Sequence, residues 1–375
     1  VLYRRRSNSL DNTLALTFAA LALFVVANSF PFLGFQMQGL TSQTTLFTGV
    51  RVLYAEGMWG LAIAVFFTAI LAPGLRIALL LYLLLPLRLG YAPPLFTRVF
   101  RWDLRLVPWE MMDVFMLGIL VAVVKLADMA TIVPGTSLWA FVMLIFLLAA
   151  AQAFLDPWEV WQRLAPMNIP TDLTSATATH CHVCGLVLPW QGDRHCPRCG
   201  AALHRRKPAS IQRTWALVIA AAILYVPANV LPIMSVTSLG KTQSDTILSG
   251  AQYLLVHGMW PLALVVFVAS VLVPLLKLAI LVFLLISVHY RSRWRLRDRT
   301  RLYRITEFIG RWSMVDIYVV TVLVALVRLG NLATIEAELG AVFFAAVVIL
   351  TMFAAMTFDP RLIWDAAEPA DGSIG

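Results

Sequence analysis

Long apolar stretches separated by short polar segments dominate this chain. Eight stretches are long enough to cross a hydrocarbon core of ~30 Å. In the first half they lie near residues 13 to 35, 59 to 87, 107 to 131 and 136 to 155, and in the second near 214 to 236, 260 to 288, 307 to 330 and 337 to 358. We therefore predict eight transmembrane helices.

The two halves are copies of one pattern. Asn28 and Pro31 match Asn229 and Pro232 at an offset of 201 residues, as do Gly57-Met58-Trp59 and Gly258-Met259-Trp260. After a two-residue slip, the offset is 203 for Trp109 with Trp312 and Asp113 with Asp316. Because each half has four helices, both halves enter the membrane from the same side. The fold predicted is all-α and polytopic, with two tandem parallel four-helix repeats.

Between the halves lies a polar segment that contains every cysteine of the chain. Cys181 and Cys184 form one CxxC, Cys196 and Cys199 form a second, and eleven residues separate the pairs. A glycine follows each pair and lets the backbone curl so that four thiolates can surround one tetrahedral ion. This spacing predicts a zinc ribbon over 180–200 with one structural Zn²⁺. Two disulfides or a redox CxxC are the alternatives, but no βαβ pattern surrounds either pair.

Composition agrees with a membrane protein, since 60% of the 375 residues are hydrophobic, against about 45–50% in soluble domains. The mean hydropathy is +0.82. The net charge of +9 comes from short basic runs beside the apolar stretches, so we expect no nucleic-acid binding. These runs fall on one side: Arg4 to Arg6, the 88 to 105 loop, His204 to Lys207, and seven arginines in the 291 to 304 loop. Positive residues mark the cytoplasm, which places both termini and the ribbon there.

The predicted domain boundaries follow from these features. They are a basic cytosolic segment at 1–12, a first transmembrane domain at 13–158, a cytosolic linker with the ribbon at 159–213, a second transmembrane domain at 214–358, and a cytosolic tail at 359–375. The loops at 36 to 57 and 237 to 258 are then external.

Ionisable residues inside predicted helices are the candidates for transport chemistry, because placing them in a membrane is costly. Lys277 and Asp316 lie at matching depths, and Arg76 and Asp113 repeat the arrangement, with Glu110 one turn before Asp113. Helical spacing adds hydroxyls around the second pair. The predicted cluster is Ser270, Lys277, Ser313, Asp316 and Thr351. The alternative is a structural salt bridge that fixes helix register.

Motifs of common enzymes are absent from the sequence. There is no GxxxxGK[ST], because Gly240-Lys241-Thr242 lacks the upstream glycine, and there is no GxSxG or HExxH. We therefore expect no enzyme activity.

Several motifs together resemble the paraquat-inducible protein A family. They include ANVLPI, DTILSG at 245–250, SVLVPLLKL at 270–278, GRWSMVDIY at 310–318 and FDPRLIWD at 358–365. The resemblance implies a bacterial inner-membrane protein that works with an MCE-domain tunnel protein of the periplasm in lipid trafficking. Members of the family typically carry a ribbon before each half. The repeat offset would place the first ribbon upstream of Val1.

The leading functional hypothesis is a component that moves or loads phospholipid between the inner membrane and such a tunnel. One alternative is a membrane scaffold that only anchors a periplasmic partner. Another is an exporter of small solutes or hydrophobic compounds.

Overall fold

The computed structural model is mostly helical. It describes residues 8–37, 40–91, 93–126, 131–164, 178–189, 195–204, 206–238, 241–256, 258, 260–326 and 333–365. The helices of the first half are α1 Ser9–Ser29, α2 Leu46–Ala55, α3 Trp59–Phe66, α4 Ala72–Arg88, α5 Phe96–Leu106, α6 Met112–Leu126, α7 Thr136–Phe154 and α8 Pro157–Leu164. Those of the second are α9 Ser210–Val230, α10 Ile247–Val256, α11 Trp260–Phe267, α12 Val273–His289, α13 Leu296–Trp312, α14 Val315–Leu326, α15 Leu339–Thr357 and α16 Leu362–Asp365.

Seven helical segments among the described residues are long and apolar enough to cross a membrane. They are Ser9–Ser29, Trp59–Arg88, Phe96–Val124, Thr136–Phe154, Ser210–Val230, Val268–His289 and Leu339–Thr357. The predicted span near 307 to 330 does not appear as one such helix, because the helix is interrupted between Trp312 and Val315 and the described part of α14 has 12 residues. The eighth span therefore stays a prediction.

The expectation of an all-α fold is wrong in the segments predicted to be external. Each half contains a three-stranded sheet. The strands are β1 Leu33–Met37, β2 Leu40–Thr44 and β3 Thr131–Pro134 in the first half, and β6 Met234–Ser238, β7 Lys241–Asp245 and β8 Ala333–Ala337 in the second. In the second sheet Val236 pairs with Gln243 on one side and Ile335 on the other. Strands of four or five residues are too short to stand out in the sequence, and each sheet needs a partner strand from about a hundred residues away.

The leading helix of each half ends beside a matched asparagine, at Ser29 in the first half and at Val230 in the second. Asn28 Nδ2 donates to the Phe24 carbonyl at 2.8 Å, and Asn229 Nδ2 donates to the Tyr225 carbonyl at 2.8 Å. Each asparagine therefore holds the last turn of its helix, and the chain leaves in an extended conformation before the following proline.

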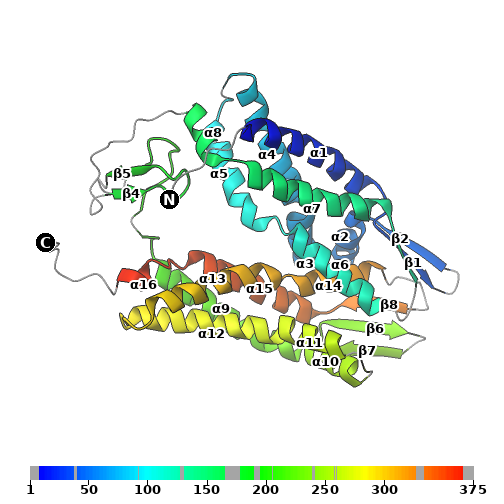
Figure 1. Cartoon of the computed structure of the whole chain (residues 1–375). Helices are drawn as coiled ribbons and strands as arrows, with labels where there is room; N and C mark the ends of the chain where they lie inside the picture. Colours follow the sequence, from blue (N-terminus) through cyan, green and yellow to red (C-terminus); the bar gives the residue numbers. More distant parts are fainter. Residues whose placement is uncertain are drawn as a thin grey trace. The chain divides into compact units, whose positions relative to one another are not determined.

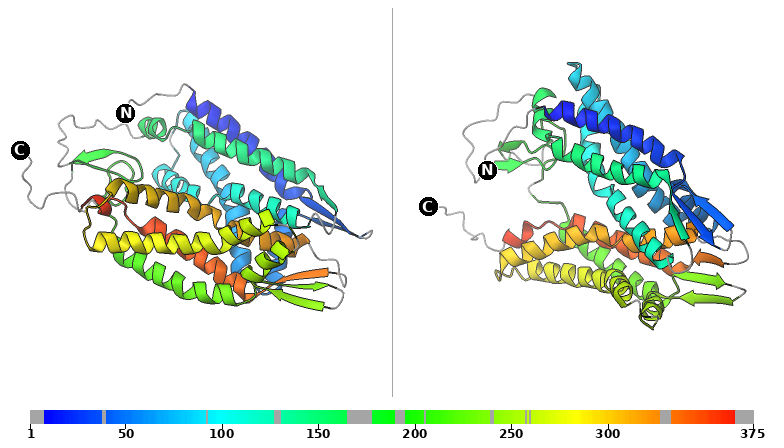
Figure 2. Two further views of the ribbon diagram at one scale, coloured as in Figure 1. Left: turned by 60° about the horizontal axis from the view of Figure 1, so that its bottom comes forward. Right: turned by 45° about the vertical axis from the view of Figure 1, so that its right-hand side comes forward.

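The chain divides into two compact units. One comprises residues 1–33, 66–113 and 134–205, and the other comprises 34–65, 114–133 and 206–375. In the first unit α1 and α7 lie side by side (Figure 2), and Ser9 Oγ donates to the Phe154 carbonyl at 2.8 Å. In the second, α9, α12, α13 and α15 lie side by side, with β6 and β7 at one end (Figure 1). Ser210 Oγ repeats the serine contact with the Thr357 carbonyl at 2.9 Å.

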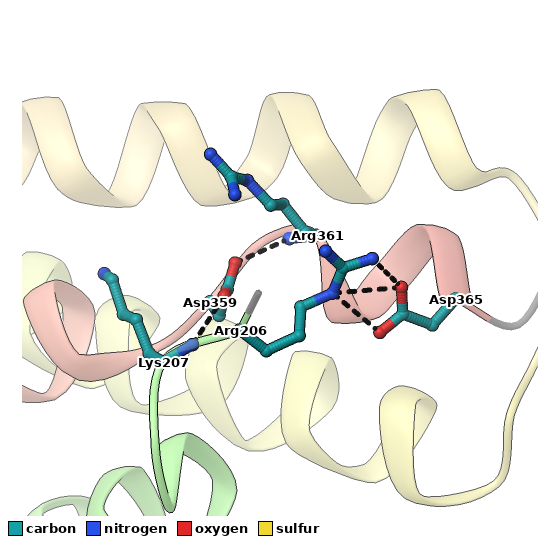
Figure 3. A network of polar contacts seen from close by, with 5 residues as sticks. All are labelled: Arg206, Lys207, Asp359, Arg361 and Asp365. Carbon is teal, nitrogen blue, oxygen red and sulfur yellow. Dashed lines mark hydrogen bonds and ion pairs between the residues drawn. The ribbon is translucent and has the colours of Figure 1, made fainter. Parts of the chain in front are cut away.

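A polar clamp fixes the segment just after the ribbon onto the end of the second half (Figure 3). Arg206 binds both carboxylate oxygens of Asp365, and the backbone N–H of Lys207 donates to Asp359 Oδ2 at 3.0 Å. The Lys207 amine also donates to the Met356 carbonyl at the end of α15, at 2.6 Å. A cation there offsets the partial negative charge of the helix C-terminus. Arg361 donates its backbone N–H to Asp359 Oδ1.

Candidate metal centre and buried polar clusters

The four cysteines lie on two tight turns. The first lies between two short strands, and the second lies between His195 and Ala202, which form an isolated antiparallel bridge. β4 Ala178–His180 pairs antiparallel with β5 Val187–Pro189. In each turn a glycine N–H donates back to the first cysteine carbonyl, from Gly185 to Cys181 at 2.9 Å and from Gly200 to Cys196 at 2.7 Å. Gly185 and Gly200 have φ of +70° and +65°. Glycine adopts this left-handed conformation readily, as the sequence predicts.

The four sulfur atoms converge on one point. Cys181, Cys184, Cys196 and Cys199 are all buried, and their Sγ atoms lie within 4.8 Å of one another. The Cys181–Cys199 and Cys184–Cys196 sulfurs are 3.5 and 3.6 Å apart. A disulfide would require about 2 Å, whereas four sulfurs bound to one tetrahedral zinc would be about 3.8 Å apart. The donor set therefore fits a metal ion and not two disulfides.

The ribbon packs against helices of the first half, within the first unit. Its cysteines share an apolar cluster with Leu80, Phe100 and Trp161. Arg101 on α5 donates from Nη2 to the Cys199 carbonyl. The buried Arg198 places its guanidinium 5.3 Å from the centre of the Trp158 ring. Because these contacts include the turns that carry the sulfurs, metal binding and the packing of α5 and α8 depend on one another.

In the first half, Arg76 lies in a buried carboxylate cluster. Its Nη1 pairs with Glu110, and its Nε lies 3.8 Å from Asp103 Oδ1. Arg76 is 2% exposed and Asp103 is 1% exposed. The predicted Arg76–Asp113 pair is wrong, because Asp113 faces outward at the start of α6 and forms no ion pair with any described side chain. The interruption between α5 and α6 turns Glu110, and not Asp113, toward Arg76.

In the second half, a buried amine lies among hydroxyls. Lys277 Nζ donates to Thr351 Oγ1 at 2.9 Å, and both residues are buried. A Cβ added at Gly310 would lie 3.8 Å from the same Nζ, so Lys277 reaches α13 one turn before Ser313. The buried Ser313 Oγ has no hydrogen-bond partner among the described atoms. The structure thus brings Lys277 and Thr351 together and places Gly310, three residues before Ser313, beside the same amine.

For two members of the predicted cluster, Ser270 and Asp316, the described structure gives no contact with Lys277. Ser270 is buried in the π-helical turn η3 Val268–Leu272, about two turns before Lys277. Asp316 lies in α14, but its side chain is outside the described part of the structure. The predicted Lys277–Asp316 pair therefore stays a prediction.

The repeat makes the two clusters directly comparable. Arg76 matches Lys277, but Asp103 and Glu110 match Thr306 and Ser313, and Leu148 matches Thr351. The first half therefore surrounds its cation with carboxylates, whereas the matched positions of the second half carry hydroxyls. Thr306 donates to the Leu302 carbonyl of its own helix at 2.9 Å. Among the described side chains, the partner of the buried Lys277 amine is therefore a neutral hydroxyl, whereas Arg76 has carboxylates. Burying a cation is expensive, which favours a functional reason for Lys277.

A π-helical turn occurs at the same place in both halves, at η1 Phe67–Leu71 and at η3. Both precede a proline, Pro73 or Pro274. In the second half Tyr225 Oη donates to the Val271 carbonyl at 3.1 Å, so a hydroxyl satisfies an acceptor inside the turn. The matched residue of the first half is Phe24, which cannot donate. π-helical turns are frequent at functional sites.

Sequence reasoning missed three polar residues of these sites. Asp103 lies seven residues before Glu110, close to two helical turns, and that spacing could have indicated a shared partner. Tyr225 could have been found from its match with Phe24, because only the residue of the second half carries a hydroxyl. Nothing in the sequence indicates that Arg101 binds the ribbon, because this contact joins residues 98 positions apart.

Comparison with known proteins agrees with this architecture. The model of the family described as Paraquat-inducible protein A matches residues 10–165 and 211–368, one match in each half. The chain belongs to this family. It is 36% identical over 365 residues to Intermembrane transport protein PqiA of Escherichia coli K12, covering 94% of this chain and 85% of that protein.

Two further relatives carry related names. Lipophilic envelope-spanning tunnel protein A of Escherichia coli K12 is 34% identical, covering 97% of this chain and 84% of its own. A protein of Haemophilus influenzae named Probable intermembrane transport protein is 28% identical, covering 95% of this chain and 86% of its own. No solved structure matches the chain. The resemblance found in the sequence is confirmed, and the relatives are named as transport proteins.

Proposed function

We propose that this protein is an inner-membrane component of an envelope lipid-transport system. It moves or loads phospholipid between the inner membrane and an MCE-domain tunnel protein in the periplasm, and it is not an enzyme. The observation that carries the proposal is the buried Lys277 amine, which donates to Thr351 at 2.9 Å where the first half has a carboxylate-bound arginine. The names of the relatives, which refer to intermembrane transport and to an envelope-spanning tunnel, support a transport route across the cell envelope.

The second-half cluster acts as the gate of a lipid-accessible cleft. Asp316 lies at the depth of Lys277 by sequence, so its protonation would change the charge of the cluster and the preferred packing of the helices. Two local features make rearrangement inexpensive. One is the π-helical turn η3 beside Ser270, and the other is the break between α13 and α14 beside Ser313.

The remaining parts of the proposal concern the zinc site, the orientation in the membrane and the number of spans. The ribbon binds one structural Zn²⁺ through Cys181, Cys184, Cys196 and Cys199, and a closed set of four thiolates has no open position for a substrate. The arginine-rich side faces the cytosol, which puts both termini and the ribbon there. A segment that includes α14 supplies the eighth span. The two four-helix domains at 13–158 and 214–358 then form a parallel repeat.

A Lys277→Met variant tests the proposal against a scaffold role. Methionine keeps the length of the side chain, and Thr351 keeps its bond to the Val348 carbonyl at 2.9 Å. In cells that depend on this system, we expect loss of the envelope lipid barrier at a normal protein level, with the periplasmic partner still captured. Unchanged barrier function would favour a scaffold. Purified protein that retains no phospholipid would instead favour a small-solute exporter.

A further inference from the structure

One exposed face of α13 changes from basic to apolar along its length. Arg297, Arg301 and Arg304 are exposed, and Ile305, Phe308 and Trp312 continue the same face. At 100° per residue all six fall within an arc of about 100°. Arg299 is on another face, where it is buried and donates to the Ser292 carbonyl. We call the six exposed residues the α13 stripe.

The depth of the stripe follows from two contacts inside the second unit. Tyr303 Oη donates to the Ala355 carbonyl at 3.0 Å, two residues before α15 ends at Thr357. Seven residues later, Gly310 lies beside Lys277, which is twelve residues from the end of α12 at His289. The start of α13 therefore extends beyond the membrane-crossing part of α12 and α15. Its end runs alongside them (Figure 1).

The stripe changes from arginines to apolar side chains as α13 passes from the ends of α12 and α15 to a position alongside them. Counted from Tyr303, Arg297 lies beyond the end of α15, Arg301 lies level with that end, and Arg304 lies within its last turn, so the three arginines span the headgroup level. The apolar residues lie deeper, level with the acyl chains. Guanidinium groups bind phosphate through paired hydrogen bonds, and all the basic residues of this run are arginine. Acidic neighbours only flank the stripe, with Asp298 Oδ1 3.8 Å from Arg301 and Glu307 exposed one turn after Arg304.

The matched helix of the first half lacks this arrangement. Phe308 matches Arg105, so a charge interrupts the apolar end. Arg304 matches Arg101, which is used to hold the ribbon at the Cys199 carbonyl. The stripe is therefore a feature of the second half and not a general result of placing basic residues on the cytosolic side.

We propose that the α13 stripe binds an anionic phospholipid of the leaflet on the arginine-rich side, with its phosphate on Arg301 and Arg304 and an acyl chain along Phe308 and Trp312. The continuous apolar half favours a lipid over a soluble acidic partner. This inference rests on the membrane-crossing helices and not on the proposed transport function, because the stripe is separate from the Lys277 cluster.

Titration of the detergent-solubilised full chain, followed by native mass spectrometry, tests the site. Dioleoyl phosphatidylglycerol is the probe, and dioleoyl phosphatidylcholine is the uncharged comparison with the same chains. Each arginine near an anionic lipid contributes about fivefold in affinity. We expect R297Q/R301Q/R304Q to weaken binding of the anionic lipid about tenfold or more, with little change for the zwitterionic lipid.

The matched control is R291Q/R293Q/R295Q, which removes the same charge from the turn before α13. This control should keep most of the preference, and both variants should keep the zinc content and melting temperature of the parent protein. Equal weakening by both triple variants, or none by the stripe variant, would overturn the proposal. Equal binding of glycerophosphoglycerol, which has no acyl chains, would also overturn it. Displacement of the lipid by soluble polyglutamate would assign the stripe to an acidic protein segment instead.

Discussion

At the scale of single residues, the two halves treat a buried cation in opposite ways. Arg76 is neutralised by Glu110 and Asp103, whereas Lys277 contacts the hydroxyl of Thr351. A paired buried cation is a stable structural unit, and breaking such a pair costs about 3–5 kcal/mol. A buried amine with a hydroxyl partner gains little stability from the contact. The first site therefore fits a structural role, and the second fits a role that requires a change of charge or position.

Tyr225 gives a test at this scale because the first half contains its natural substitute, Phe24. Tyr225→Phe removes the hydroxyl that donates to the Val271 carbonyl inside η3. We expect a loss of about 0.5–1.5 kcal/mol, together with faster amide hydrogen exchange confined to residues near η3. The mirror variant Phe24→Tyr is the control and should leave exchange in the second half unchanged. Exchange in η3 equal to that of the parent protein would show that the hydroxyl does not hold this turn.

At the scale of elements, local patterns predicted most of the helices and the ribbon. An apolar run of about twenty residues or a CxxC turn is determined by its own residues, and Gly185 and Gly200 occupy the left-handed positions that their places after the cysteines predict. The sheets were missed because β6 requires β8, which is about a hundred residues later. The spacing of Asp103 from Glu110 indicates a shared partner, but it does not identify Arg76, which lies in another helix. The partner in a contact between distant segments has no local signal.

The ribbon supplies the test for this scale. We expect one zinc per chain by elemental analysis of the parent protein. Cys196→Ser should lose the metal and lower the melting temperature, because the sulfur-bearing turns share a core with Phe100 and Trp161. Hydrogen exchange in α5 should increase in the same variant. A Cys196→Ser protein that lacks zinc but keeps the parent stability would contradict a structural metal.

A second pair of variants separates metal binding from docking. Arg101→Gln removes the donor to the Cys199 carbonyl, whereas Arg98→Gln removes an exposed charge from the same helix. We expect faster loss of zinc to a chelator in Arg101→Gln only. Equal rates in the two variants would show that the ribbon holds its metal independently of α5.

At the scale of the whole molecule, the two halves share one order of elements, but they differ in their polar residues. Both halves share the order of their helices and sheet strands, a π-helical turn, and a serine contact that joins α1 to α7 in the first half and α9 to α15 in the second. Only the second half combines the hydroxyl cluster, Tyr225 and the α13 stripe. We interpret the first half, with the ribbon packed against it, as the more rigid part of the protein. Under the proposed function, the second half is then the part that handles lipid.

The most direct test of this asymmetry measures transfer of labelled phospholipid from proteoliposomes to the tunnel partner. In the first half, R76M/D103L/E110L removes the whole ionic cluster, and replacing a complete buried cluster by apolar residues is often neutral or stabilising. We predict near-normal transfer for this variant. Lys277→Met should lower the rate at least about tenfold, or about 1.4 kcal/mol in activation free energy, in protein that binds its zinc and its partner normally. Loss of transfer in the first-half variant, with normal transfer in Lys277→Met, would contradict the account.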